Sequence, residues 1–181
     1  ILTRATNGDI RFWDSPRNRH EGGILARSTL PAGPLIEDQQ AEARKLAAAA
    51  ADELEYVGVM TMEFFATANG PLFNEMAPRV HNSGHWTIEG AATSQFENHI
   101  RAVCDLPLGA TDLMVDRVEM DNLIGEDANN WERLFADDDA NPVLLGQPLQ
   151  ARGQIDRIAH HRIGLAHWRA HVAHGHLPGV D

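Results

Sequence analysis

The sequence predicts an α+β fold in which several strands form a sheet and a helix covers one face of it. Three segments support this prediction: a pair of short strands within residues 1–13, an Ala-rich helix over residues 39–55, and a β-hairpin over residues 57–76. An amphipathic helix must bury one side, and a sheet built from these strands offers the surface for it.

Residues 1–6 and 9–13 are predicted as two short strands because Asn7-Gly8 between them is a typical hairpin turn pair. Residues 16–23 are rich in polar residues and glycine and are predicted to form a loop. A further strand is predicted over residues 24–28.

A helix is predicted after the break that the prolines of residues 31–34 introduce. Asp38 fits the N-cap position, and residues 39–55 are rich in alanine, the best helix former. Helical periodicity predicts that the following residues form the buried stripe: Leu46, Ala50 and Leu54.

A β-hairpin is predicted over residues 57–76. Residues 57–66 alternate and are rich in β-branched, aromatic and Met residues, residues 68–70 have turn composition, and residues 71–76 return. Gly70 is free to take the left-handed conformation that a three-residue hairpin loop usually needs.

Two glutamates are predicted to meet across this hairpin. If the turn is centred on Asn69, Glu63 lies directly opposite Glu75, with Cβ atoms about 4.5–5.5 Å apart and like charges that repel. Mg²⁺ would remove the repulsion, because it takes oxygen ligands and is commonly held by one or two carboxylates plus substrate phosphates. Asn74 can add a neutral oxygen or an amide donor. The alternative is a solvated hairpin face that carries a harmless pair of glutamates.

A polar loop over residues 78–87 follows the hairpin. It combines a guanidinium, two imidazoles, an amide, two hydroxyls and an indole around one glycine. Arg79 supplies a planar donor fork, while Ser83, Gly84 and neighbouring backbone N–H groups can form an anion-binding nest. The composition favours an anion-binding loop over a polar turn with incidental histidines.

Residues 88–92 are predicted to be a short helix, and residues 94–97 form a capping box that opens a longer one. The apolar stripe of the longer helix consists of Phe96, Ile100 and Val103. A strand is predicted over residues 115–124.

Composition excludes several classes of function. The net charge of −11 argues against a nucleic-acid-binding surface, which needs a basic patch. The single Cys104 rules out an internal disulfide and fits the reducing cytoplasm. No stretch approaches the roughly 18 apolar residues of a membrane span. We therefore expect a cytoplasmic protein of one domain, or of one domain and a fragment.

Residues 74–87, NEMAPRVHNSGHWT, resemble the signature of N5-carboxyaminoimidazole ribonucleotide synthetase, an ATP-grasp carboxylase family of purine biosynthesis. The similarity includes residues 58–65 before this segment and parts of residues 90–109 after it, and it covers roughly residues 1–146. It also includes Asn18, His20, Gly23-Ile24-Leu25 and Asn122-Leu123-Ile124-Gly125. Other ATP-grasp enzymes share the two glutamates, whereas residues 81–86 are specific to this family.

The resemblance implies the second half of an ATP-grasp domain over residues 1–112, a small β-rich C-terminal domain over residues 113–159, and a divergent His-rich tail over residues 160–181. It implies that the chain begins mid-domain, because the preceding domain and the first half of the ATP-grasp domain precede these motifs in the family. A homodimer is also implied.

The implied activity is the carboxylation of 5-aminoimidazole ribonucleotide with bicarbonate, using ATP and Mg²⁺. Glu63 and Glu75 would hold the metal on the ATP phosphates, with Asn74 beside them. The resemblance implies that Arg79 and His81 are catalytic. It implies that the substrate-binding residues are Arg79, His81, Asn82, Ser83, Gly84 and Arg152, whereas Trp86 packs the loop.

Two alternative functions stay open. One is a different ATP-grasp ligase or carboxylase that uses another acceptor. The other is a non-catalytic truncated fragment that acts as a folding or dimerisation module. In the tail, the helical spacing of His167, His171 and His174 could bind a transition metal, or the C-terminus is simply divergent.

Overall fold

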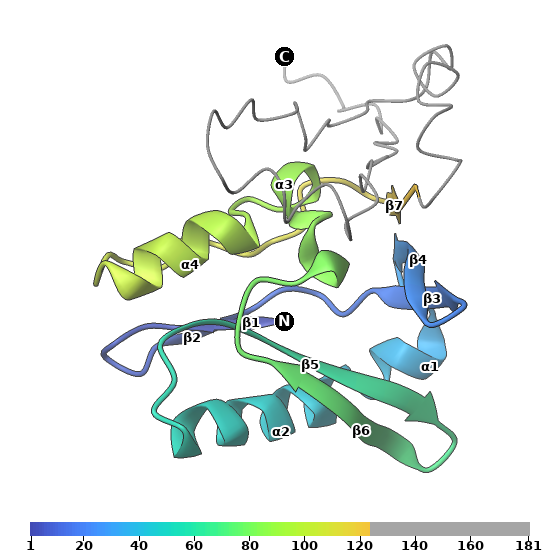
Figure 1. The fold of residues 1–181 in the computed structure, drawn as a ribbon, viewed down its shortest axis with the longest axis horizontal. Coiled ribbons are helices and arrows are strands. Elements are labelled where there is room, and N and C mark those ends of the chain that lie inside the picture. The colour runs from blue at the N-terminus through green and yellow to red at the C-terminus, as the bar shows by residue number, and fades with distance from the viewer. Residues whose placement is uncertain (124–181) are drawn as a thin grey trace, which may run out of the picture.

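The computed structural model of the chain describes residues 1–123. Figure 1 shows the arrangement of their elements. In chain order these elements are β1 (Leu2–Arg4), β2 (Ile10–Phe12), β3 (Arg17–Glu21), β4 (Ile24–Leu30), α1 (Pro34–Glu37), α2 (Gln40–Glu53), β5 (Gly58–Thr67), β6 (Gly70–Ala77), the 3₁₀ helix η1 (Asn82–Gly84), α3 (Thr87–Gly90), α4 (Gln95–Val103) and β7 (Val118–Asp121).

The strands form two antiparallel sheets. The larger sheet has the order β2-β1-β5-β6, and the smaller one has the order β3-β4-β7. Helix α2 lies along one face of the larger sheet, and α4 lies on its other side (Figure 1). The α+β class is confirmed, but the sheet is covered on two faces and not on one.

Helix α2 packs through alanines. Ala47 and Ala51 are buried against Leu2 and Met60 of the sheet, whereas Leu46 and Leu54 are 44% and 56% exposed. The predicted stripe is therefore wrong for Leu46 and Leu54, whereas Ala50 packs against this core as predicted, because small side chains let the helix axis approach the sheet closely. The prediction that Asp38 is the N-cap of this helix is wrong as well.

Asp38 ends α1, and α2 begins after Gln39, whose side chain makes no capping hydrogen bond.

Besides the hydrophobic core under α2, a second core lies between the sheets and α3. It consists of Trp13, Leu25, Leu30, Ala32, Val59, Trp86, Val118 and Met120.

The loop predicted over residues 16–23 is instead the strand β3, which pairs with β4. Gly22 and Gly23 have φ angles of 57° and 81° and form the two-residue turn between the two strands. β3 lies at the edge of its sheet and exposes most of its polar side chains, so it lacks the apolar alternation that identifies a strand.

The hairpin of β5 and β6 places Glu63 opposite Glu75, as predicted. The turn itself differs: Thr67 pairs with Gly70, so the loop has two residues and not three. A β-bulge beside Glu63 inserts Asn74 as an extra residue of β6 and restores the register. Because of the bulge, Asn74 and Glu75 both lie across from Glu63.

Helix α4 begins at the predicted N-cap, since the Ser94 hydroxyl accepts a hydrogen bond from the N–H of Glu97 at 3.2 Å, whereas the Glu97 carboxylate accepts from Arg101. Its buried face differs from the prediction. Gln95, Asn98 and Ala102 are buried, whereas Ile100 and Val103 are exposed.

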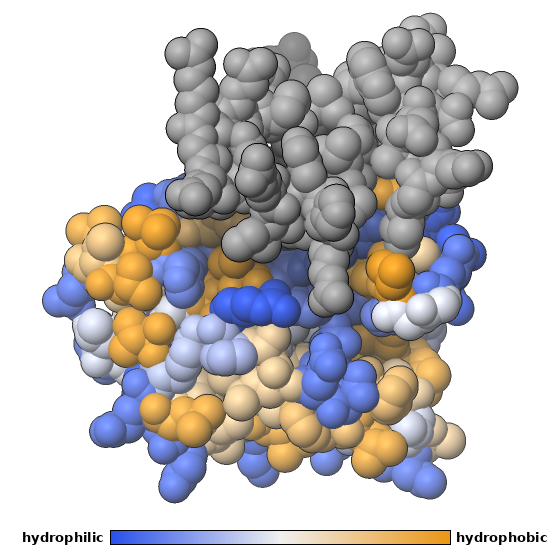
Figure 2. Space-filling model, viewed as in Figure 1, coloured by the Kyte–Doolittle hydropathy of each residue, from blue (hydrophilic) through white to orange (hydrophobic). Residues whose placement is uncertain are grey.

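Apolar side chains are visible over α4 in the surface of Figure 2. The face toward the sheet is polar because neighbouring backbone groups there need hydrogen-bond partners.

The predicted strand over residues 115–124 is present as the shorter β7, which pairs with β4. The domain boundary after residue 112 stays a prediction. Arg152 and the three tail histidines lie outside the described residues. Within residues 1–123, no helix has the length and apolar character needed to cross a membrane.

Candidate active site

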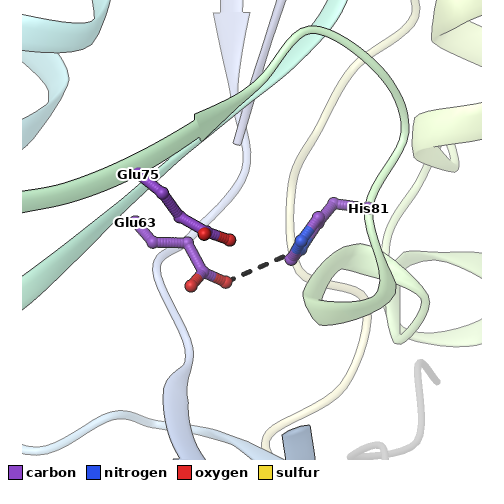
Figure 3. Close-up of side chains that lie close together, drawn as sticks. All are labelled: Glu63, Glu75 and His81. Atoms are coloured by element: carbon purple, nitrogen blue, oxygen red, sulfur yellow. Dashed lines mark ion pairs between the residues drawn. The ribbon is translucent and has the colours of Figure 1, made fainter. Parts of the chain in front are cut away.

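Three side chains converge where the hairpin meets the loop that follows it (Figure 3). Glu63 extends from β5, Glu75 from β6, and His81 from the segment before η1. One ligand atom from each of the three lies within 4.8 Å of the others. The Nδ1 atom of His81 is 3.7 Å from Oε1 of Glu63, and both side chains are largely buried.

This cluster has the properties of a divalent-cation site. Oε1 of Glu63 is buried and has no hydrogen-bond partner among residues 1–123. A buried carboxylate oxygen without a donor is costly unless a cation or another charge compensates it. Two carboxylates favour a hard cation with oxygen ligands. Glu63 and Glu75 therefore fit Mg²⁺, and His81 lies beside them.

Burial lowers the pKa of His81 below its ordinary value. The negative charge of Glu63 opposes this shift and the positive charge of Arg79 reinforces it. Nδ1 of the ring accepts the N–H of Ser83 at 3.3 Å and lies 2.9 Å from the Ser83 hydroxyl. A neutral imidazole whose Nδ1 accepts this hydrogen bond carries its proton on Nε2, so Nε2–H can donate to a ligand.

The loop buries two of its predicted substrate-binding residues. Ser83 and Gly84 are both buried, and a Cβ atom on Gly84 would lie 2.6 Å from Oε1 of Gln95. The missing side chain of Gly84 therefore makes room for Gln95. Asn82 has a buried Oδ1 atom without a hydrogen-bond partner in the described part of the chain. Trp86 is buried in the core, as predicted.

A cavity of about 350 Å³ lies beside the cluster, between the hairpin, β3 and the start of α2. Three of the predicted site residues line it: Glu63, Asn74 and Ser83. Arg79 does not line the cavity; it is exposed, and its guanidinium donates to the Val80 carbonyl at 3.0 Å.

Sequence reasoning did not identify several polar residues of the cavity wall, including Arg17, Gln39 and Gln40. Gln39 and Gln40 lie where α2 begins, in a stretch that reads as an ordinary helix start, so no pattern marks them. Asn18 and His20 also line the cavity. Both belong to the part of the sequence that resembles the family, and this resemblance was the signal that identified them.

The chain is similar to known proteins over most of its length. The ATP-grasp domain family matches residues 1–96. The N5-carboxyaminoimidazole ribonucleotide synthase of Brucella melitensis is 44% identical over 161 residues, which are 88% of this chain and 43% of that protein. The chain spans about a third to two fifths of the length of the curated relatives it matches.

Solved structures show the same similarity. The N5-carboxyaminoimidazole ribonucleotide synthetase of Thermus thermophilus has a TM-score of 0.79 and 40% identity, over 96% of this chain and 45% of that one. The ADP complex of the Staphylococcus aureus N5-carboxyaminoimidazole synthetase has a TM-score of 0.77 and 28% identity, over 96% and 44% of the two chains. This chain belongs to the ATP-grasp family.

Proposed function

We propose that the chain takes part in the ATP-dependent carboxylation of 5-aminoimidazole ribonucleotide, which yields N5-carboxyaminoimidazole ribonucleotide for purine biosynthesis. The observation that supports this most directly is the convergence of Glu63, Glu75 and His81 beside a cavity, with one buried oxygen of Glu63 that has no hydrogen-bond partner within residues 1–123. Relatives named as the synthase of this product match at 44–49% identity.

The proposed reaction has three steps. A bicarbonate oxygen attacks the γ-phosphorus of ATP, which forms carboxyphosphate and releases ADP. The bond between the carboxyl carbon and the bridging oxygen of carboxyphosphate then breaks and gives CO₂ and phosphate. Finally the exocyclic amine of the ribonucleotide attacks CO₂, forms a C–N bond and gives its proton to the phosphate released in the second step.

Glu63 and Glu75 are the residues that would hold Mg²⁺, and Asn74 lines the cavity together with Glu63. A bound Mg²⁺ neutralises charge on the phosphates as the phosphoryl group is transferred. The bulge contributes here, because it places residues 74 and 75 together across from Glu63 in the strand register.

Arg79 and His81 act on the side of bicarbonate and the ribonucleotide. The exposed guanidinium of Arg79 can turn from the Val80 carbonyl to bind a carboxylate or phosphate through two parallel hydrogen bonds. His81 is kept neutral by its burial, and because its Nδ1 accepts from Ser83, its Nε2–H can donate a hydrogen bond to bicarbonate or carboxyphosphate. Asn82, Ser83 and Gly84 shape the loop that carries both residues.

The proposal extends to the homodimer and the cytoplasmic location that the family resemblance implies. Residues beyond the described range, such as Arg152, are proposed to contact the ribonucleotide phosphate.

Isothermal titration of Mg²⁺-ATP and of 5-aminoimidazole ribonucleotide into the chain tests the proposal. We expect Glu75→Gln to weaken Mg²⁺-ATP binding and Arg79→Ala to remove ribonucleotide binding. Arg11→Ala, at an exposed arginine of β2, serves as the control that leaves both unchanged. If the folded chain binds neither ligand, the chain is a non-catalytic module. If it binds Mg²⁺-ATP but not the ribonucleotide, another ATP-grasp ligase becomes the better assignment.

A further inference from the structure

We infer that Gln95 is a positioning residue for His81: its side-chain amide holds both backbone polar groups of His81 and so fixes the imidazole beside Glu63 and Glu75. Gln95 is the first residue of α4, fourteen positions after His81. The inference rests on the proposed role of the Glu63–Glu75–His81 cluster and adds a residue that touches none of its side chains.

Two hydrogen bonds define the contact. The N–H of His81 donates to Oε1 of Gln95 at 3.0 Å, and Nε2 of Gln95 donates to the carbonyl of His81 at 2.6 Å. A single amide thus pairs with His81 at two points, as a neighbouring strand would. The backbone of His81 cannot shift or rotate without breaking one of these bonds.

Gln95 is itself held rigidly. Its side chain is fully buried, and its backbone N–H donates to Oγ1 of Thr87 at 2.9 Å. Thr87 in turn donates to the carbonyl of Gly84 at 2.6 Å. Because Gly84 lacks a Cβ atom, the amide of Gln95 can lie against it. These contacts tie the loop after the hairpin to the start of α4.

The imidazole is therefore fixed from two directions. Gln95 fixes the backbone of His81, and Ser83 fixes the Nδ1 atom of its ring. Without the amide, the N–H and carbonyl of His81 must turn toward water to be satisfied, and the ring then moves away from Glu63.

The same helix provides a matched control. Asn98 is also fully buried and pairs at two points with the backbone of Gly109: Nδ2 donates to its carbonyl at 3.1 Å, and its N–H donates to Oδ1 at 2.8 Å. Gly109 is not part of the cluster. Gln95→Met and Asn98→Leu remove equivalent hydrogen bonds at nearly constant volume, but only the first touches His81.

Mn²⁺ is the probe for the experiment, with two readouts. One is its dissociation constant, measured by titration. The other is the broadening that it causes in the NMR signal of the His81 Cε1–H, which is assigned by its loss in His81→Gln. We expect Gln95→Met to weaken Mn²⁺ binding by about tenfold or more and to reduce the broadening. Asn98→Leu should lower the melting temperature similarly and leave both readouts unchanged.

A second Gln95 variant and a measurement without metal keep the test decisive. If Gln95→Met does not fold, Gln95→Asn replaces it, because the shorter amide reaches only one of the two backbone groups. In metal-free protein, the His81 signal should shift in the Gln95 variant and not in Asn98→Leu, so the result does not depend on metal binding.

The inference is overturned if a folded Gln95 variant matches Asn98→Leu in the His81 signal and in Mn²⁺ affinity. A different result would overturn the proposed function and leave this inference standing. In that result, the Gln95 substitution shifts the His81 signal, but the wild-type chain binds neither Mg²⁺-ATP nor the ribonucleotide.

Discussion

The hairpin of β5 and β6 and the helix α4 both carry polar side chains in a partly buried setting, but they use them differently. On the hairpin, Glu63 keeps a buried oxygen without a hydrogen-bond partner in the described part of the chain. On α4, both amides are fully paired with backbone groups of distant segments, Gln95 with His81 and Asn98 with Gly109. The unpaired oxygen of Glu63 is the atom that we propose for a cation, whereas the two paired amides hold the backbone of the loops that carry His81 and Gly109.

The largest effect is expected on metal binding, when one of the two facing glutamates of the hairpin is replaced. Glu75→Gln should weaken divalent-metal binding more than about 100-fold, because loss of a direct ligand exceeds the cost of losing an outer-shell partner. Without metal, the same variant should be more stable by up to about 1 kcal/mol, since two like charges no longer face each other. Metal titration and urea unfolding measure the two effects.

Glu53→Gln, at an exposed carboxylate of α2, is the control and should change neither quantity. A Glu75→Gln protein that is less stable without metal would show that the pair is structural and not reserved for a ligand.

The two regions also differ in how far the sequence predicts them. The pairing of Glu63 with Glu75 agrees with the prediction because the two-residue turn and the bulge at Asn74, neither of which the sequence revealed, shift the register by one residue in opposite directions. The buried face of α4 was not predictable, because the partners of Gln95 and Asn98 are loop backbone groups that no local pattern reveals. The polar edge strand β3 was missed for a related reason: exposed side chains do not alternate.

A second prediction concerns His85, which lies between the hairpin and α4 and stacks on Phe96 with ring centroids 5.5 Å apart. Burial, and secondarily the charge of His81, lower the pKa of His85 from 6.5 to about 4. The unfolded chain therefore binds a proton at a higher pH than the folded one. The folded state should lose about 2–3 kcal/mol as the pH falls from 6.5 to 4.

The measurement is the unfolding free energy across this pH range for the wild type and for His85→Phe, which keeps an aromatic ring against Phe96. The variant should lose less stability on acidification, whatever its stability at pH 7. Parallel curves for the two proteins would show that His85 does not titrate in this range.

A third prediction compares the two ends of the hairpin. Gly58 has a φ of 118°, and a Cβ there would lie 2.9 Å from the ring of His99 on α4, whose Nδ1 accepts the N–H of Val59. Gly70 has a φ of 109° at the turn, and a Cβ atom there would lie 3.5 Å from Oε2 of Glu42. Gly58→Ala should cost about 2 kcal/mol and Gly70→Ala about 1 kcal/mol, because only the first adds a clash to the backbone strain.

Chemical denaturation of both variants measures the difference, and His99→Ala provides the test of its cause. In the His99→Ala background the ring is absent, so Gly58→Ala should cost no more than Gly70→Ala. An unchanged cost of Gly58→Ala in that background would assign the whole effect to backbone strain.

The smallest effect is expected on the outer face of α4. Ile100 is 56% exposed, although helical periodicity places it in an apolar stripe. Ile100→Ser should therefore change the free energy of unfolding by less than about 0.5 kcal/mol, as for other surface substitutions. Ala102→Ser, on the fully buried side of the same helix, is the contrasting variant and should cost more. If Ile100→Ser were the more damaging change, the apolar stripe of α4 would have to be covered in solution, and the division between its polar inner face and its apolar outer face would not hold.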